Sequence, residues 1–294
     1  MGISYSTVLA SVVVDSIGGK DFPRIVVSDN MKNVKHFSLT VPLTANTSVD
    51  LALSEAAFRT MKEINPYLTA LYAFSGAEKK GVYPTQADSL VEEWIANAPT
   101  SVYSPERALF ENLRGLVSLI DNDPIAAESW FSRANKSDPE LQAAILNRGF
   151  MESYRGYHDR AIEFHNQVVD GSFWSESTDS KIVYAAHIGL GIALASQRKF
   201  EESDYHFAEA IAITPDGVAG YYYWARSLMK QDRAAEATAL VGTAQRNAKQ
   251  IANYAELAYL YFWLPDEANG VLERRTKNLP KVLGMLVAPE SSTE

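Results

Sequence analysis

Two kinds of apolar pattern divide this chain, an alternating one near its beginning and a helical one from about residue 50 onward. Val8–Asp15, Arg24–Asp29 and His36–Leu43 are rich in Val, Ile, Thr and Phe, and turn residues such as Gly18 and Gly19 separate them. Alternation is clearest in the last of the three, which indicates a strand with one solvent-facing side. The pattern predicts two or three short strands within residues 1–48.

After Thr47 the spacing of apolar residues changes from two to about 3.6. We expect a connecting helix in 49–67, capped by Ser48 or Asp50 and ended before Pro66, because a residue that precedes proline disfavours helical backbone. The region 68–262 is typical of paired helices. The region 263–294 is typical of an irregular cap that ends in a polar tail.

Small residues return every 34 positions through the middle of the chain. Gly115 and Gly149 are 34 residues apart, and so are Ala127 and Ala161. A period of this length predicts helix–turn–helix units stacked in tandem. The predicted units are 68–101, 108–141, 142–175, 184–217 and 218–251. Residues 176–183, rich in Ser, Thr and Asp, interrupt the period and predict a longer surface loop.

The spacing has a steric explanation. Two antiparallel helices approach closely only where a side chain is small, and a large residue such as Phe131 or Phe207 then fills the space beside the contact. The second unit departs from this pattern, because His165 and Val168 stand where Phe and Ala are expected. Each helix pair leaves one apolar face uncovered, so it is stable only when stacked on a neighbour.

These offsets resemble those of the tetratricopeptide repeat (TPR) family, in its bacterial form. Leu146-Asn147-Arg148-Gly149 looks like the asparagine–arginine–glycine run of the first helix in such repeats, and Asn112-Leu113-Arg114-Gly115 is related to it. The resemblance implies a mainly α fold. It would be an α-solenoid of helix–turn–helix repeats in a right-handed superhelix, with a small N-terminal β-containing segment.

The resemblance also implies that the concave face, lined by the first helix of each repeat, binds a partner. The candidate partner-binding residues on that face are Asn112, Leu116, Asn147, Phe150, Tyr154, Ile188, Tyr222, Tyr223 and Arg226. The family's carboxylate clamp needs Lys and Arg at several of these places. Because only Asn147 matches it, we do not expect a receptor for C-terminal tails.

The groove expected from these residues is apolar and aromatic, with a cationic edge at Arg226 and Lys230. An uncovered apolar groove would exceed the patch size usual for a monomer, so we expect an amphipathic helix, an extended segment or the chain's own N-terminal strands to cover it. Asn147 would bind ligand backbone, and Phe150, Tyr154 and Tyr222 would bury apolar anchors. Arg226 would pair with an acidic group.

Composition narrows the function classes. The chain has 294 residues, 47% hydrophobic and 21% charged, which is typical of a folded protein. Its net charge of -9 disfavours a nucleic-acid partner, because phosphate-binding surfaces need clustered Lys and Arg. The chain has no cysteine, and no apolar run is long enough to span a membrane. Val8–Val14 is too short and lacks a basic flank for a secretory signal, which favours the cytoplasm over a periplasmic or envelope location.

No catalytic, cofactor or metal motif is evident, so we expect neither an enzyme nor a cofactor. None of the histidines has the one-turn spacing of a two-histidine metal site. They are His36, His158, His165, His187 and His206. The main hypothesis is therefore a non-enzymatic scaffold or adaptor that binds a protein or peptide, as in the assembly of a larger complex.

An alternative stays open at this point. The N-terminal module would bind a small effector, and the repeats would relay the signal or mediate dimerisation, which would make the protein a homo-oligomer.

Overall fold

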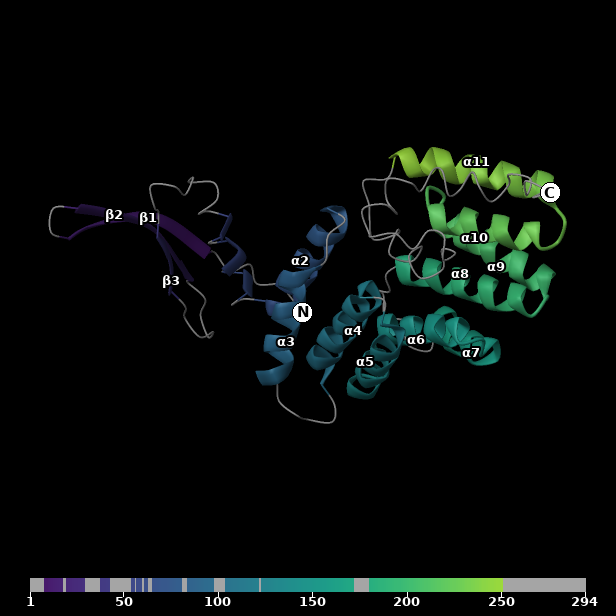
Figure 1. Cartoon of the computed structure of the whole chain (residues 1–294), viewed down its shortest axis with the longest axis horizontal. Coiled ribbons are helices and arrows are strands. Elements are labelled where there is room, and N and C mark those ends of the chain that lie inside the picture. The colour runs from purple at the N-terminus through teal and green to yellow at the C-terminus, as the bar shows by residue number, and fades with distance from the viewer. Residues whose placement is uncertain are drawn as a thin grey trace, which may run out of the picture. The chain divides into compact units, whose positions relative to one another are not determined.

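The computed structural model of the chain is shown in Figure 1. The structure describes residues 8–17, 20–29, 38–42, seven positions between 54 and 62, and residues 65–80, 84–97, 104–121, 123–171 and 180–250. It divides the chain into two compact units, Met1–Tyr72 and Ala73–Glu294. The predicted cap and tail at 263–294, and residues 176–179 of the predicted insert, lie outside the described residues. Residues 180–183 of that insert are helical, so the predicted surface loop is wrong for them, because the next helix begins before the repeat unit does.

The first unit contains an antiparallel sheet of three strands in the order β1-β2-β3. The strands are β1 (Val8–Ile17), β2 (Lys20–Asp29) and β3 (Ser38–Pro42). Ile17 pairs with Lys20 and Val8 with Asp29, so only Gly18 and Gly19 connect the first two strands. The small N-terminal β-containing segment is thus confirmed. The described positions between 54 and 62 are helical and fall within the predicted connecting helix.

Ten helices follow in the described residues. They are α2 (Pro66–Lys80), α3 (Thr85–Asn97), α4 (Pro105–Ile120), α5 (Pro124–Ser137), α6 (Gln142–Tyr154), α7 (His158–Val169), α8 (Ser180–Ser196), α9 (Phe200–Ile213), α10 (Val218–Met229) and α11 (Ala234–Gln250).

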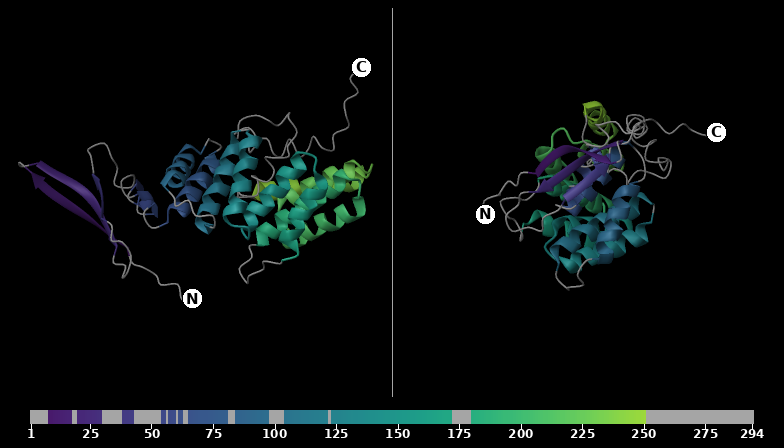
Figure 2. Two further views of the ribbon diagram at one scale, coloured as in Figure 1. Left: turned by 90° about the horizontal axis from the view of Figure 1, so that it is seen from below. Right: turned by 90° about the vertical axis from the view of Figure 1, so that its left-hand side faces the viewer.

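The helices from α4 onward form four antiparallel hairpins: α4–α5, α6–α7, α8–α9 and α10–α11. Each hairpin also packs on the next through α5–α6, α7–α8 and α9–α10, and the first helices α6, α8 and α10 touch in succession. Figures 1 and 2 show these hairpins stacked along the second unit. The arrangement is an α-solenoid of helix–turn–helix repeats.

Local sequence signals explain where α4 and α5 begin. The Ser104 hydroxyl accepts a hydrogen bond from the Arg107 amide at 3.3 Å, and the Asp123 carboxylate accepts one from the Ala126 amide at 2.9 Å. Each cap satisfies an amide that has no partner within the helix. A proline follows each capping residue and occupies the first helical position, where the missing amide hydrogen costs nothing.

The same turn closes successive hairpins. At Gly156, Arg198 and Asp232 the backbone is left-handed, with φ of 83°, 62° and 60°. The next residue's amide then bonds back five residues, as in Tyr157 N–H to Glu152 O at 2.9 Å and Lys199 N–H to Leu194 O at 3.0 Å. This is the Schellman geometry of a helix C-terminus. Its recurrence at equivalent repeat positions shows that the sequence period is a structural period.

Glycines make room for the close approach of helices within the hairpins. A methyl carbon placed on Gly115 would lie 2.4 Å from a ring carbon of Phe131, and one on Gly191 would lie 2.6 Å from a ring carbon of Phe207. Real carbon atoms do not approach so closely, so only glycine fits at these two positions. The small residues therefore lie at the helix contacts where the 34-residue pattern predicts them.

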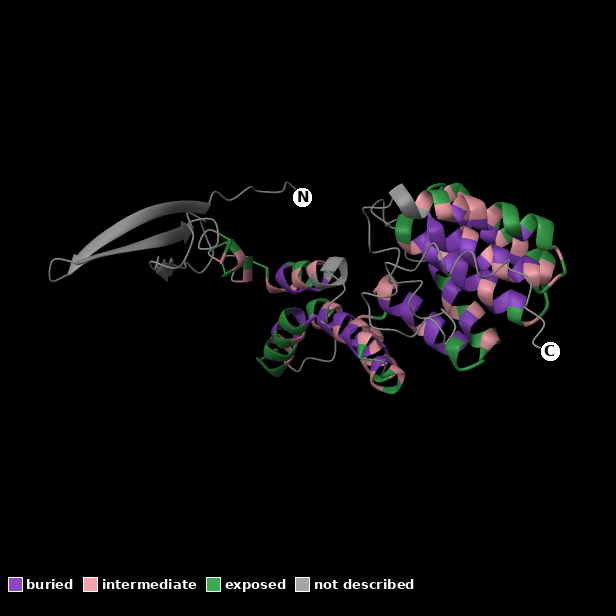
Figure 3. Ribbon diagram, turned by 45° about the horizontal axis from the view of Figure 1, so that its top comes forward, coloured by how far each residue is buried: buried purple, intermediate pink, exposed green. Residues whose placement is uncertain are grey.

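The core follows the stacking contacts. Figure 3 shows buried residues on the faces where α4–α11 meet and exposed residues on the outer faces. One cluster joins the last two hairpins through Ile188, Phe207, Tyr222 and Leu228. Tyr184 reaches into the next repeat, where its hydroxyl accepts a hydrogen bond from the Gly220 amide at 3.0 Å. Adjacent hairpins are thus held by apolar burial and by specific polar contacts.

Candidate functional site

The nine residues predicted to line an open groove all lie on first helices, namely α4, α6, α8 and α10. Six of them are buried: Asn112, Asn147, Phe150, Ile188, Tyr222 and Tyr223. Leu116 and Arg226 are partly exposed, and Tyr154 is 58% exposed. The expected exposure is therefore wrong for the six buried residues, because other side chains of the chain pack over them. Their role in partner binding stays a prediction.

The two asparagines bind each other. The Asn147 amide nitrogen on α6 donates a hydrogen bond to the Asn112 side-chain oxygen on α4, at 2.8 Å, and both residues are buried. This contact joins first helices of successive hairpins. Because buried amides need such partners, the pair fixes the stacking of the two helices.

Phe150 packs on the residue that departs from the repeat pattern. Its ring meets His165 edge-on, with the ring centres 4.9 Å apart. His165 is fully buried between two hairpins, since methyl carbons placed on Gly149 and Gly189 would lie 2.6 and 2.3 Å from its ring. Neither ring nitrogen of His165 has a hydrogen-bond partner. Burial lowers the pKa of His165 to about 3, so this imidazole is neutral at pH 7.

Tyr222 and Tyr223 form a buried aromatic pair on α10, with ring centres 5.1 Å apart at nearly right angles. The Arg226 guanidinium lies 5.9 and 6.0 Å from the two ring centres, within range of a cation–π contact. Burial raises the pKa of Tyr222, against the opposing charge and hydrogen bond of Arg226. Burial also lowers the pKa of Lys230, and the Arg226 charge adds to this effect. Arg226, one of the two cations of the predicted edge, thus lies over the buried aromatic pair.

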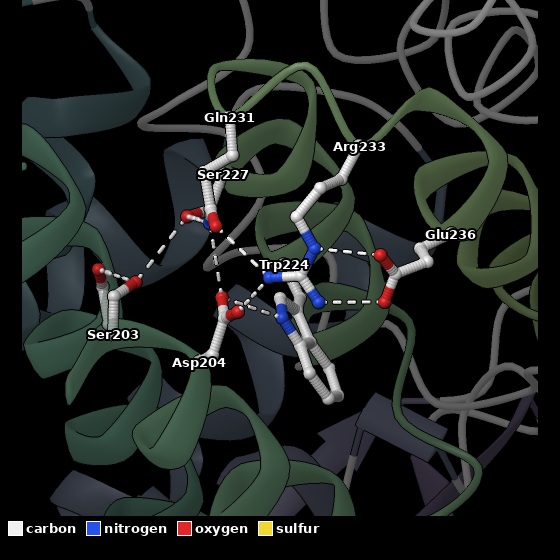
Figure 4. A network of polar contacts seen from close by, with 8 residues as sticks. Ser203, Asp204, Trp224, Ser227, Gln231, Arg233 and Glu236 are labelled. Atoms are coloured by element: carbon white, nitrogen blue, oxygen red, sulfur yellow. Dashed lines mark hydrogen bonds and ion pairs between the residues drawn. The ribbon is translucent and has the colours of Figure 1, made fainter. Parts of the chain in front are cut away.

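A polar network that sequence reasoning missed connects α9, α10 and α11 (Figure 4). The Asp204 carboxylate accepts hydrogen bonds from the Trp224 indole at 2.9 Å and from the Arg233 guanidinium at 2.5 Å. Arg233 also pairs with Glu236 at 2.7 Å. These bonds raise the pKa of Arg233 and lower that of Glu236. The sequence signal for this network is the spacing of Arg233 and Glu236, which are three residues apart at the start of α11.

A pair of histidines meets across the α8–α9 hairpin. The Nδ1 atoms of His187 and His206 are 3.0 Å apart, and the ring centres are 5.2 Å apart. Burial is the main cause that lowers the pKa of both, to about 4 for His206. The described residues contain no group of three His, Asp or Glu side chains arranged to hold a metal ion.

Among the described residues, none of the helices is both long and apolar enough to cross a bilayer.

Sequence comparison gives no match: no family model fits the chain, and no curated protein matches it significantly. Solved structures do resemble it. The type IV pilus biogenesis factor PilW is 15% identical with a TM-score of 0.50, and the alignment covers 76% of this chain and 94% of PilW. A tetratricopeptide repeat protein from Parabacteroides merdae is 15% identical (TM-score 0.49, coverage 80% and 93%). MamA from Desulfovibrio magneticus is 14% identical (TM-score 0.45, coverage 64% and 98%).

The likeness to PilW concerns the fold alone. It confirms the predicted fold class, an α-solenoid of tetratricopeptide-type repeats.

Proposed function

We propose that this chain is a non-enzymatic scaffold that binds a protein or peptide along the first helices of its hairpins, α4, α6, α8 and α10. The observation that carries the proposal is the stacked-hairpin fold, shared with PilW, in which successive first helices contact one another. Such a stack has few long-range constraints and offers an extended surface for a partner. PilW is described as a pilus biogenesis factor, and by analogy we propose that this chain acts in the assembly of a larger complex.

The contacts that a partner would make fall on the accessible residues of these helices. Tyr154 at the end of α6 offers a large aromatic surface with little side-chain entropy to lose. Leu116 on α4 adds apolar area, and Arg226 with Lys230 at the end of α10 supplies positive charge. The partner that fits is an amphipathic helix or extended segment with apolar anchors and an acidic group. The six buried residues would shape this surface without touching the partner.

A matched pair of tyrosines tests the surface. Tyr154 on first helix α6 and Tyr205 on second helix α9 are each 58% exposed, so substituting either with alanine should leave the fold intact. We expect Tyr154→Ala to weaken binding about 30-fold, as loss of an aromatic anchor worth about 2 kcal/mol would. Tyr205→Ala should bind like the wild type.

The measurement has two stages. Proteins captured from source-cell lysate by the wild-type chain and both variants are compared by mass spectrometry, and the affinity of the purified partner is then measured for all three. A partner lost by Tyr154→Ala and kept by Tyr205→Ala supports the proposed face. Equal binding by both variants would remove α6 from the interface.

A further inference from the structure

The His187–His206 contact joins two imidazole rings inside a helical hairpin. His187 on α8 is buried and His206 on α9 is partly exposed, and their Nδ1 atoms face each other at 3.0 Å. Tyr205, beside them on α9, meets the His206 ring edge-on with the centres 5.2 Å apart. In the folded chain one Nδ1–H donates a hydrogen bond to the other Nδ1. The two side chains thus bring two imidazole nitrogens close together.

We propose that His187 and His206 chelate a divalent late transition-metal ion, such as Zn²⁺, Ni²⁺ or Cu²⁺, between α8 and α9. Imidazole nitrogen is a donor that these ions prefer. The ion would replace the hydrogen bond between the rings and cross-link the two helices of the hairpin. This site is separate from the proposed protein-binding function and does not depend on it.

The ring positions match such a chelate closely. A tetrahedral ion with Zn–N bonds of about 2.0–2.1 Å puts its two nitrogens about 3.3 Å apart and the ring centres about 5.2 Å apart. The observed ring centres are 5.2 Å apart, and the nitrogens are 3.0 Å apart. Widening the separation of the two nitrogens by about 0.3 Å would give the ion its bond lengths.

The protonation states also suit metal binding. Burial lowers the pKa of both rings, with the charge of His187 as a further cause for His206, so both are neutral near pH 7. A neutral ring binds through whichever nitrogen carries no proton. Binding requires both Nδ1 atoms to be bare, so the ring that carries its proton on Nδ1 changes to the tautomer protonated on Nε2. Both rings stay neutral in this exchange.

The surroundings leave the ion partly open to solvent. The charge of Glu209, one turn from His206 on α9, acts on His187 and favours a cation there. In the described part of the chain no third His, Asp or Glu completes the coordination. Water molecules would fill the remaining positions and reach the ion from the side of His206, which is partly exposed.

Isothermal titration of the untagged full-length chain with Zn²⁺ at pH 7.5 tests the proposal. We expect one ion per chain, and a binding that weakens about 100-fold or more in either His187→Asn or His206→Asn, because the second ligand of a chelate acts at high effective concentration. His158→Asn, which removes a partly exposed histidine on α7, is the matched control and should bind like the wild type. Zn²⁺ should raise the Tm of the wild type and the control only.

A spectroscopic measurement on the wild type keeps the test valid if a variant loses its helical circular dichroism. Electron paramagnetic resonance of the chain loaded with one Cu²⁺ should show hyperfine coupling to two imidazole nitrogens. Coupling to one nitrogen would overturn the proposal, and so would Zn²⁺ affinity that is unchanged when both histidines are replaced. The pair would then be a hydrogen bond between helices and nothing more.

Discussion

Replacing Tyr222 with alanine should destabilise the folded chain by about 3–5 kcal/mol, the usual cost of truncating a large buried aromatic side chain. Tyr222 is only 1% exposed and packs with Ile188 of the preceding hairpin and Leu228 of its own helix. Its loss would leave a cavity between the last two hairpins and would remove one of the two rings under Arg226. Urea denaturation followed by far-ultraviolet circular dichroism measures the change.

The position of Tyr222 in the repeat alone would suggest a different outcome, with weakened partner binding and an unchanged Tm. The stability of Tyr222→Ala separates the two accounts, and Tyr222→Phe is its control, because it keeps the buried ring and removes only the hydroxyl that bonds to Arg226. We expect it to cost about 1 kcal/mol. An alanine variant as stable as the wild type would mean that the ring is not part of the core.

Acidification from pH 7 to pH 4 should cost about 3 kcal/mol of unfolding free energy through His165 alone. The sign follows from the direction of the shift: burial lowers the pKa of His165 to about 3, whereas the unfolded chain keeps a value of about 6.5. Between these values the unfolded state binds the proton and the folded state does not. The contribution is therefore complete above about pH 6.5 and is lost as the pH falls toward 3.

The control for His165 is the residue that other repeats carry at its position. His165→Phe removes the titrating ring and keeps an aromatic side chain between Gly149 and Gly189, as Phe131 does beside Gly115. His187 and His206 titrate in the same direction in both proteins, so the difference between the two pH profiles isolates His165. Parallel profiles for wild type and His165→Phe would contradict the assignment.

The repeat architecture could be predicted from the sequence because its cause is local and periodic. Gly115 and Phe131 lie in one hairpin, and the same pair of residue types returns as Gly191 and Phe207. A 34-residue period in the sequence therefore predicts this glycine–aromatic contact directly. The strands could be predicted for a similar reason, since Val, Ile, Thr and Phe alternate between turn residues.

The burial of the groove residues could not be predicted from the sequence, because it depends on how neighbouring hairpins pack against one another. The Asn147–Asn112 bond spans 35 residues, and the bond from Gly220 to the Tyr184 hydroxyl spans 36. A position in the repeat says which helix carries a residue, but the rotation between hairpins decides what covers it. The His187–His206 contact lies within one hairpin, but no other predicted unit carries histidines at these two positions, so the 34-residue period does not indicate it.

The environment of His165 could be predicted only in part from the sequence. The repeat alignment shows that a histidine replaces the expected Phe, so the departure is visible in the sequence. That both ring nitrogens are buried without a hydrogen-bond partner depends on two glycines, one of them in the following repeat. Only the structure brings these residues together.

The central claim is that the hairpins α4–α5, α6–α7 and α8–α9 close through glycines that admit an aromatic ring, that of Phe131, His165 or Phe207. A double-mutant cycle tests it most directly, with the unfolding free energy measured for Gly191→Ala, Phe207→Leu and the double variant. Gly191→Ala should destabilise by about 1–3 kcal/mol in the wild type, because its methyl group would meet the Phe207 ring. In the Phe207→Leu background that cost should fall by about 1 kcal/mol or more.

Gly242 on α11 is the control, because among the described residues a methyl group there would meet only an Arg246 side-chain nitrogen, at 3.7 Å. Gly242→Ala should stabilise the chain by up to about 1 kcal/mol through helix propensity alone. The account predicts opposite signs for Gly191→Ala and Gly242→Ala, with the difference shrinking when Phe207 is shortened. Equal stabilisation by both substitutions, in either background, would contradict it.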